Sequence, residues 1–128
     1  MTSVEVPYSV ASALPSLTVL DITNEVRREL VGSGRDAGIA YVSPLDDPAL
    51  VRVQERESGF FADLEELLSR LVAQDERERE RLLCMLLGPR NEQIPFAAGQ
   101  LCLGQWQRIL LLGFERPSEP RWHLTLLG

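Results

Sequence analysis

The sequence predicts an α+β fold with a mainly antiparallel sheet. Short β-rich segments bounded by glycine and proline lie in both halves of the chain, and one apolar stripe at helical spacing lies between them. The regular alternation of strand and helix that produces a parallel sheet is absent. Because 128 residues suffice for one hydrophobic core and not for two, we expect a single domain over residues 1–128.

The first third of the chain is predicted to hold two strands and a helix. Alternating apolar and polar residues predict a strand over residues 4–10, and a second β-rich segment covers residues 17–21. Either Asp21 or Thr23 can cap the helix that follows. The glycines within residues 32–34 are expected to end that helix.

The middle of the chain is predicted to hold two strands and the clearest helix. Residues 38–43 and 49–54 are β-rich, and the proline-flanked segment 44–48 separates them. An amphipathic helix is predicted by seven apolar residues at helical spacing: Phe60, Phe61, Leu64, Leu67, Leu68, Leu71 and Val72. We expect this stripe to face the core, with Leu64 and Leu68 fully buried.

The rest of the chain is predicted to contain one more helix and then strands. Residues 75–81 alternate in charge sign, which is typical of a solvated face leading into an apolar helix over residues 82–87. Strands are predicted at 93–96, 106–114 and 122–126.

The run Ile109-Leu110-Leu111-Leu112 has no polar alternation. Both faces of this strand should therefore be covered, and a neighbouring subunit is one candidate for that cover.

Composition excludes several classes of function. The formal net charge is −6, the pI is near 4.8, and all 13 basic residues are arginine, so lysine Schiff-base chemistry is excluded and nucleic-acid binding is disfavoured. The chain has no recognisable signal peptide and no apolar run approaching the roughly 18 residues of a membrane span. Cys84 and Cys102 lie in apolar runs and are predicted to be buried thiols. We therefore expect a cytoplasmic protein with neither a nucleic-acid nor a membrane partner.

Few residues carry recognisable chemistry. His123 is the only histidine, and in a terminal strand such a residue is usually structural; with no second histidine and no paired cysteine, a zinc site is unsupported. Asp46 and Asp47 form an acidic pair in a proline-flanked turn, where turn formation is the common role. Glu55 and Asp63 can place two further carboxylates near one end of the sheet.

A series of short motifs runs along nearly the whole chain. It comprises residues 20–23 (LDIT), 63–65 (DLE), 86–88 (LLG), 94–95 (IP) and 103–109 (LGQWQRI). In this order the motifs resemble the YjbQ family, also called the secondary thiamine-phosphate synthase family. Gly104, Trp106 and Gln107 match the family signature Gly-Thr-Trp-Gln, with Gln105 in place of threonine.

The resemblance implies a YjbQ-like α+β fold, with a sandwich-like sheet and two or three helices, assembled as a homotrimer. It also implies a polar pocket near a subunit boundary, in which histidines hold a metal or an anion. The activity that it implies joins an aminopyrimidine pyrophosphate to a thiazole phosphate.

The family histidines are missing from this sequence. Leu45, followed by two aspartates, stands where the family has His-Thr-Thr or His-Thr-Ser; residues 74–76 offer no imidazole in the shortened loop; and Arg81 aligns with the third histidine. Asp63 is retained, and Glu55 is retained if the alignment slips by one residue.

These positions define a candidate remnant pocket, formed by Asp46, Asp47, Glu55, Asp63 and Arg81. No transition-metal site is expected, although the four carboxylates can bind Mg²⁺ or Ca²⁺ weakly.

Two functions are compatible with these residues. The first is a non-catalytic YjbQ-like protein that binds a small molecule, an anion or a protein partner. The second is a thiamine-phosphate synthase-type enzyme with a site rebuilt from Asp46, Asp47 and Asp63 with a nearby arginine, either Arg52 or Arg81.

Overall fold

The computed structural model describes residues 17–45, 49–73, 77–114 and 121–128. The strand predicted over residues 4–10 therefore lies outside the described residues. The described elements are β1 (Thr18–Asp21), α1 (Thr23–Ser33), β2 (Gly38–Pro44), β3 (Ala49–Glu55), α2 (Ser58–Leu71), α3 (Arg79–Leu87), β4 (Glu92–Ala97), β5 (Gln100–Leu101), β6 (Gln107–Gly113) and β7 (Trp122–Leu127).

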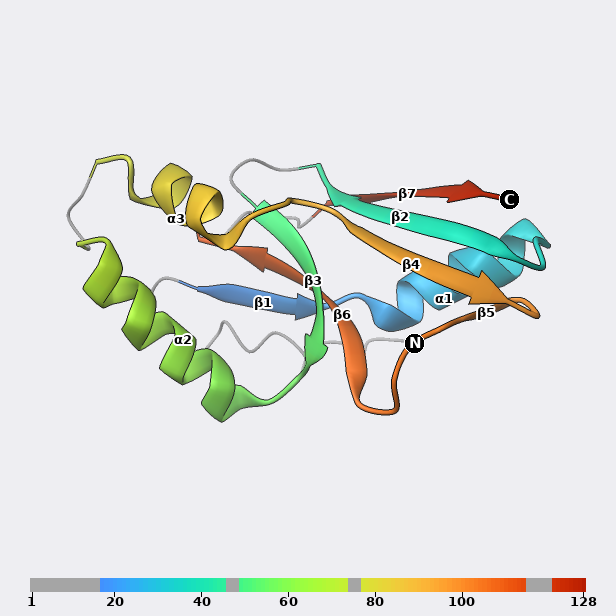
Figure 1. The fold of residues 1–128 in the computed structure, drawn as a ribbon, viewed down its shortest axis with the longest axis horizontal. Coiled ribbons are helices and arrows are strands. Elements are labelled where there is room, and N and C mark those ends of the chain that lie inside the picture. Colours follow the sequence, from blue (N-terminus) through green and yellow to red (C-terminus); the bar gives the residue numbers. More distant parts are fainter. Residues whose placement is uncertain (1–16, 46–48, 74–76, 115–120) are drawn as a thin grey trace.

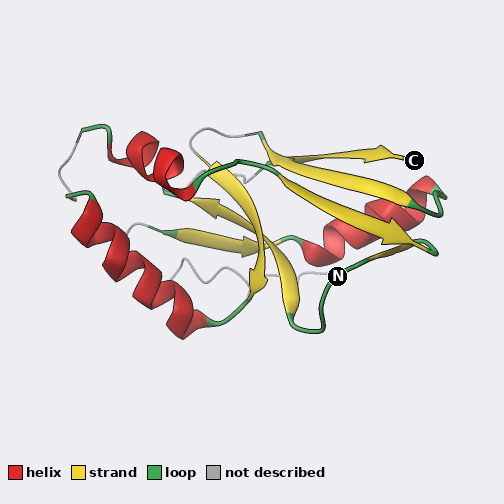
Figure 2. Cartoon of the chain, in the orientation of Figure 1, coloured by secondary structure: helices red, strands yellow, loops and turns green. Residues whose placement is uncertain are grey.

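The strands form two antiparallel sheets. One has the order β1-β6-β3 and the other the order β5-β4-β2-β7, and every neighbouring pair is antiparallel. Figure 1 shows the four-stranded sheet and α1 at the right, the three-stranded sheet in the middle, and α2 and α3 at the left. Together with the three helices (Figure 2), this arrangement confirms the predicted α+β class.

Strand β6 lies at the centre of the three-stranded sheet and contributes side chains to two hydrophobic cores, one on each face of that sheet. Ile109 and Leu111 pack into the core shared with α1 and the four-stranded sheet. Leu110 and Leu112 point to the opposite side and pack against α2 and α3. Both faces of the apolar run Ile109-Leu110-Leu111-Leu112 are thus covered by this chain itself. A neighbouring subunit, which the sequence suggested as one possible cover, is not needed there.

Helix termini follow the local sequence closely. Gly34, in the left-handed region at φ 71°, ends α1 as predicted, and its N–H donates to the carbonyl of Val31 at 3.2 Å. Helix α2 is capped by Glu57, whose carboxylate accepts hydrogen bonds from the N–H groups of Gly59 and Phe60 at 2.7 and 2.9 Å. The sequence analysis did not identify the Glu57 cap.

Only part of the predicted stripe on α2 faces the core. Phe61, Leu68 and Val72 are buried, and Leu64 is only partly buried. Three apolar residues of the stripe are instead largely exposed, while Glu65 is buried. The prediction was wrong for the exposed three because a stripe of seven residues is wider than the strip of helix surface that one sheet can cover.

Helix α3 corrects two further expectations. Arg79, predicted on a solvated face, is buried, and its Nε lies 3.4 Å from the carbonyl oxygen of Val72. Only Leu83 of the apolar helix is fully buried. We define the apolar surface of α2 and α3 as the exposed set Phe60, Leu67, Leu71, Leu82, Met85 and Leu86.

The two cysteines are not buried as predicted. Cys84 is half-buried on α3, and Cys102 is exposed. Cys102 follows β5, and its N–H donates to the carbonyl of Pro95 in β4 at 2.8 Å. Among the described helices, none has both the length and the apolar character needed to cross a membrane.

Candidate functional site

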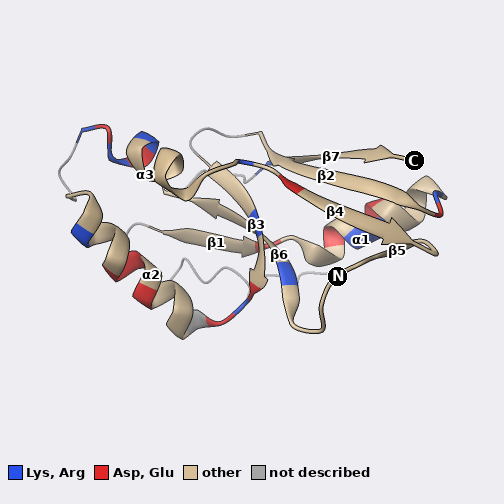
Figure 3. Cartoon of the chain, in the orientation of Figure 1, with Lys and Arg blue, Asp and Glu red and all other residues tan. Residues whose placement is uncertain are grey.

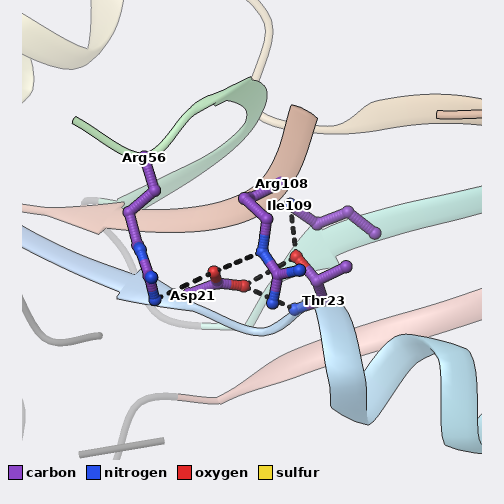
Figure 4. A network of polar contacts seen from close by, with 5 residues as sticks. All are labelled: Asp21, Thr23, Arg56, Arg108 and Ile109. Atoms are coloured by element: carbon purple, nitrogen blue, oxygen red, sulfur yellow. Dashed lines mark hydrogen bonds and ion pairs between the residues drawn. The ribbon is translucent and has the colours of Figure 1, made fainter. Parts of the chain in front are cut away.

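The most organised polar cluster in the described residues surrounds Asp21, the last residue of β1. Its side chain is 0% exposed. One carboxylate oxygen accepts a hydrogen bond from Arg108 Nε at 2.7 Å and lies 3.5 Å from a terminal guanidinium nitrogen of Arg56. The other accepts hydrogen bonds from the Thr23 N–H at 2.9 Å and from the Thr23 hydroxyl at 2.6 Å (Figure 4). We call this set the Asp21 network.

Sheet pairing brings these distant residues together. Strand β6 lies between β1 and β3, with Asp21 opposite Leu110 and Gln54 opposite Arg108. Arg56 follows the end of β3 and so reaches the same place. Thr23 Oγ1 also accepts a hydrogen bond from the Ile109 N–H at 2.7 Å, which ties the start of α1 to β6.

Asp21 is held in its charged form. Burial acts to raise the pKa of its carboxyl, because a charge is poorly solvated inside the protein. Hydrogen bonds from Arg108 and Thr23, together with the charge of Arg108, outweigh burial and lower the pKa below 3.8. The network is therefore one carboxylate with two guanidinium groups near it, both partly exposed to solvent. Such an arrangement holds the arginines in fixed positions and can present them to an anion.

The signature motif forms the turn that leads into this network. The Gly104 N–H donates to Gln107 Oε1 at 2.6 Å, and the Gln107 N–H donates to the Gly104 carbonyl at 3.1 Å. Trp106, at the tip, is 67% exposed. Gly104 and Gln107 thus shape the turn before β6, and the turn presents the indole to the surface. Figure 3 shows one blue segment near the start of β6, and Arg108 is the one charged residue of that strand.

The structure places Glu55, Asp63 and Arg81, the described members of the predicted remnant pocket, on three separate elements. Glu55 is exposed at the end of β3, opposite Gln107 and next to Arg56. Asp63 is exposed on α2, and Arg81 is exposed on α3, where it lies 3.5 Å from Glu78. Of these three described residues, only Glu55 adjoins the Asp21 network along the sheet.

Asp46 and Asp47 lie outside the described residues. Within the described residues, no group of three or more histidine, cysteine, aspartate or glutamate side chains is arranged to hold a metal ion. Arg52, one of the two arginines considered for a rebuilt site, donates to the carbonyls of Leu87 and Pro89 and so caps the end of α3.

The sequence analysis did not name Arg56, Arg108 or Asp21 as site residues: Asp21 was a possible helix cap and a member of the LDIT motif, and Arg108 was a member of the LGQWQRI motif. One available signal was the charged Arg108 immediately before the apolar run of β6. A charged residue next to a buried strand requires an oppositely charged partner. Asp21 was a candidate partner for Arg108, because it ends a β segment immediately before a predicted helix.

Comparison with known proteins adds an independent line of information. The family model described as "UPF0047 protein YjbQ-like" matches residues 12–128. A UPF0047 protein of Archaeoglobus fulgidus is 33% identical over 112 residues, covering 80% of this chain and 86% of its own length. A UPF0047 protein of Methanothermobacter thermautotrophicus is 28% identical over 119 residues, covering 86% and 82%.

Solved structures show the same fold. A hypothetical protein from Aeropyrum pernix has a TM-score of 0.76 at 29% identity, covering 88% of this chain and 90% of that one. A YjbQ/UPF0047 family protein from Clostridium acetobutylicum has a TM-score of 0.77 at 24% identity, covering 87% and 92%. With the family model and the relatives in agreement, the chain belongs to the YjbQ, or UPF0047, family.

Proposed function

We propose that this chain is a cytoplasmic, homotrimeric YjbQ-like protein whose active site is degenerate and which binds a small anionic ligand without catalysing a reaction on it. The observation that carries the proposal is the Asp21 network. It holds Arg56 and Arg108 against one buried carboxylate, next to the turn formed by the signature motif. Guanidinium groups fixed in this way are suited to phosphate or carboxylate groups.

The residue types support binding over catalysis. Arginine stays protonated and so cannot exchange protons with a substrate near neutral pH. Acid–base chemistry near neutral pH is usually supplied by histidine, and Arg81 and Leu45 occupy two positions where the family resemblance places histidines. The described site can therefore hold negative charge more readily than it can move a proton.

Calorimetric titration with inorganic pyrophosphate tests the proposal. We expect the wild-type chain to bind pyrophosphate and Arg56→Gln to bind it at least about tenfold more weakly, because the variant loses one charge-assisted contact. Arg70→Gln is the matched control, since Arg70 is an exposed arginine on α2 paired with Glu66. Equal binding by wild type and Arg56→Gln would contradict the assigned site, provided that circular dichroism shows both to be folded.

An activity assay tests separately the proposal that the protein catalyses no reaction. Purified protein with both thiamine precursors and Mg²⁺ is expected to form no thiamine phosphate. Turnover that is lost in Asp63→Asn would favour the alternative, an enzyme of the thiamine-phosphate synthase type with a rebuilt carboxylate and arginine site. The position of Glu55 beside Arg56 and opposite Gln107 is the observation that keeps this alternative open.

The apolar surface of α2 and α3 supports the homotrimer. Its six large side chains are between 43% and 82% exposed, and Met85 is the most exposed of them. Exposed apolar residues in this number are more typical of a protein interface than of a monomer surface.

Light scattering at micromolar concentration is expected to give three times the chain mass of 14.4 kDa. A charge introduced by Met85→Glu should shift the protein toward the monomer, because burying an unpaired carboxylate in an interface is costly. A wild-type species of 14.4 kDa alone would contradict the trimer. A trimer that persists in Met85→Glu would show that another surface forms the contact.

A further inference from the structure

A small apolar cleft lies between strand β3 and the helices α2 and α3. It encloses about 180 Å³, and β3 contributes Leu50, Arg52 and Gln54 to its lining. These are alternate residues of one strand, so their side chains lie on the same face of the sheet. Leu112 of β6 also lines the cleft, and the strand register places it directly opposite Leu50. The sheet therefore forms one continuous wall of the cleft.

The helices form the other wall, which is apolar. Phe60, Phe61 and Leu64 of α2 and Leu87 of α3 complete the described lining. Phe61 is only 1% exposed, and its ring meets that of Phe60 edge to face, with 5.3 Å between the ring centroids. A cavity of about 150 Å³ lined by leucine and phenylalanine is large enough for benzene. This cleft can therefore hold a single ring or a short hydrocarbon chain.

Arg52 is the one charged residue among the described residues that line the cleft. Its Nη1 donates to the carbonyls of Val51 and Pro89 at 2.9 and 2.7 Å, and its Nη2 donates to the carbonyl of Leu87. A guanidinium group has five N–H donors. These three bonds therefore leave the Nε–H and one Nη2–H for a further acceptor.

The charge of Arg52 has no counter-charge within the described part of the chain. Its three acceptors are neutral carbonyls, and none of the described ion pairs includes it. Arg56 and Arg108, in contrast, both lie against the carboxylate of Asp21. Because Arg52 is only partly exposed, water compensates its charge incompletely. An arginine held by neutral groups beside an apolar wall is suited to an anion that comes from outside the chain.

We propose that this cleft binds a small monocarboxylic acid with one apolar ring or a short hydrocarbon chain. The carboxylate accepts the remaining N–H donors of Arg52, and the apolar part packs against Phe61 and Leu64. A carboxylate carries one negative charge and matches the single arginine, whereas a phosphate ester carries up to two. None of the described lining residues belongs to the Asp21 network, so this inference does not rest on the anion site proposed there.

Nuclear magnetic resonance with benzoate tests the proposal. We expect nuclear Overhauser effects between the ring protons of benzoate and the methyl groups of Leu64 and Leu87, together with saturable shifts of those methyl signals. Benzyl alcohol lacks the carboxylate and acetate lacks the ring, so each should bind at least about tenfold more weakly than benzoate. Tighter binding of phenyl phosphate than of benzoate would overturn the assignment to a carboxylate.

Substitutions identify the groups that bind. Arg52→Gln is expected to weaken benzoate binding at least about tenfold, whereas Arg70→Gln, which removes the same charge from the exposed face of α2, should leave it unchanged. Since Arg52→Gln also loses bonds to the end of α3, circular dichroism and light scattering compare its fold and assembly with those of the wild type. Leu64→Phe keeps Arg52 but fills part of the cleft, and it should weaken benzoate binding to a similar extent.

Three results would overturn the proposal. The first is equal benzoate binding by the wild type and by either folded variant, Arg52→Gln or Leu64→Phe. The second is the absence of contacts with Leu64 and Leu87 at about 10 mM benzoate, a concentration that would reveal even millimolar affinity. The third is a set of shifts at Thr23 and Ile109, lost in Arg56→Gln, without contacts to Leu64, which would support the Asp21 network as the carboxylate site instead.

Discussion

Replacing Asp21 with asparagine is expected to lower the free energy of unfolding by about 3 kcal/mol at neutral pH. The substitution keeps an oxygen that can accept from Thr23 but removes the negative charge that faces Arg108 and Arg56. Removing one partner from a buried ion pair leaves the other without compensation, which costs about 3–5 kcal/mol when both are buried. We expect the lower end of that range because both guanidinium groups are partly exposed to water.

The same residue gives the stability a defined pH dependence. The pKa of Asp21 is lowered from 3.8 in the folded chain, so its contribution is fully present above the unfolded value. That contribution decreases as the pH falls below about 4 toward the folded pKa, where the native carboxylate takes up its proton. The Asp21→Asn variant should lose this component of the acid sensitivity.

Chemical denaturation at several pH values measures both effects. Asp36→Asn is the matched control, because Asp36 is exposed beyond the end of α1. Two results would show that the Asp21 network does not stabilise the fold: equal stability of Asp21→Asn and wild type at neutral pH, or an unchanged acid profile in the variant.

Truncating Leu68 to alanine is expected to cost about 2–5 kcal/mol of unfolding free energy. Leu68 is only 3% exposed and packs in the core between α2, α3 and the three-stranded sheet. Val31 provides the control, since it is 73% exposed on α1 and lies outside the apolar surface of α2 and α3, and Val31→Ala should change the stability by less than about 0.5 kcal/mol.

Urea unfolding of the two variants at one protein concentration makes the comparison. A loss below about 1 kcal/mol in Leu68→Ala would mean that the described core contact is incorrect.

Local sequence patterns predicted the elements well because each pattern acts over one or two turns of chain. The helical spacing in residues 60–72 predicted α2, and the glycine at position 34 predicted the end of α1. The same spacing did not tell Leu68 from Leu67, because which part of an apolar stripe is covered depends on the sheet beneath it.

The polar sites were harder to predict because their members are distant in sequence. Asp21 and Arg108 are 87 residues apart, and β6 brings them together only by pairing with β1. Likewise, His123 appeared unrelated to Leu45, which stands at a position of a family histidine. The β2–β7 pairing nevertheless brings the end of β2, next to Leu45, beside the start of β7, which contains His123. A sequence alignment matches residues of different chains position by position, and it does not show which strands pair in the fold.

The position of β6 late in the chain also governs when the fold can form during synthesis. Among the described strands, β1 and β3 do not pair with each other; β6, which spans Gln107–Gly113, lies between them and pairs with both. Until the ribosome has released that segment, β1 and β3 lack the strand that lies between them in the folded chain. Because such long-range pairing makes folding slow, the nascent chain exposes apolar strands for most of its translation, which is the period when chaperones bind.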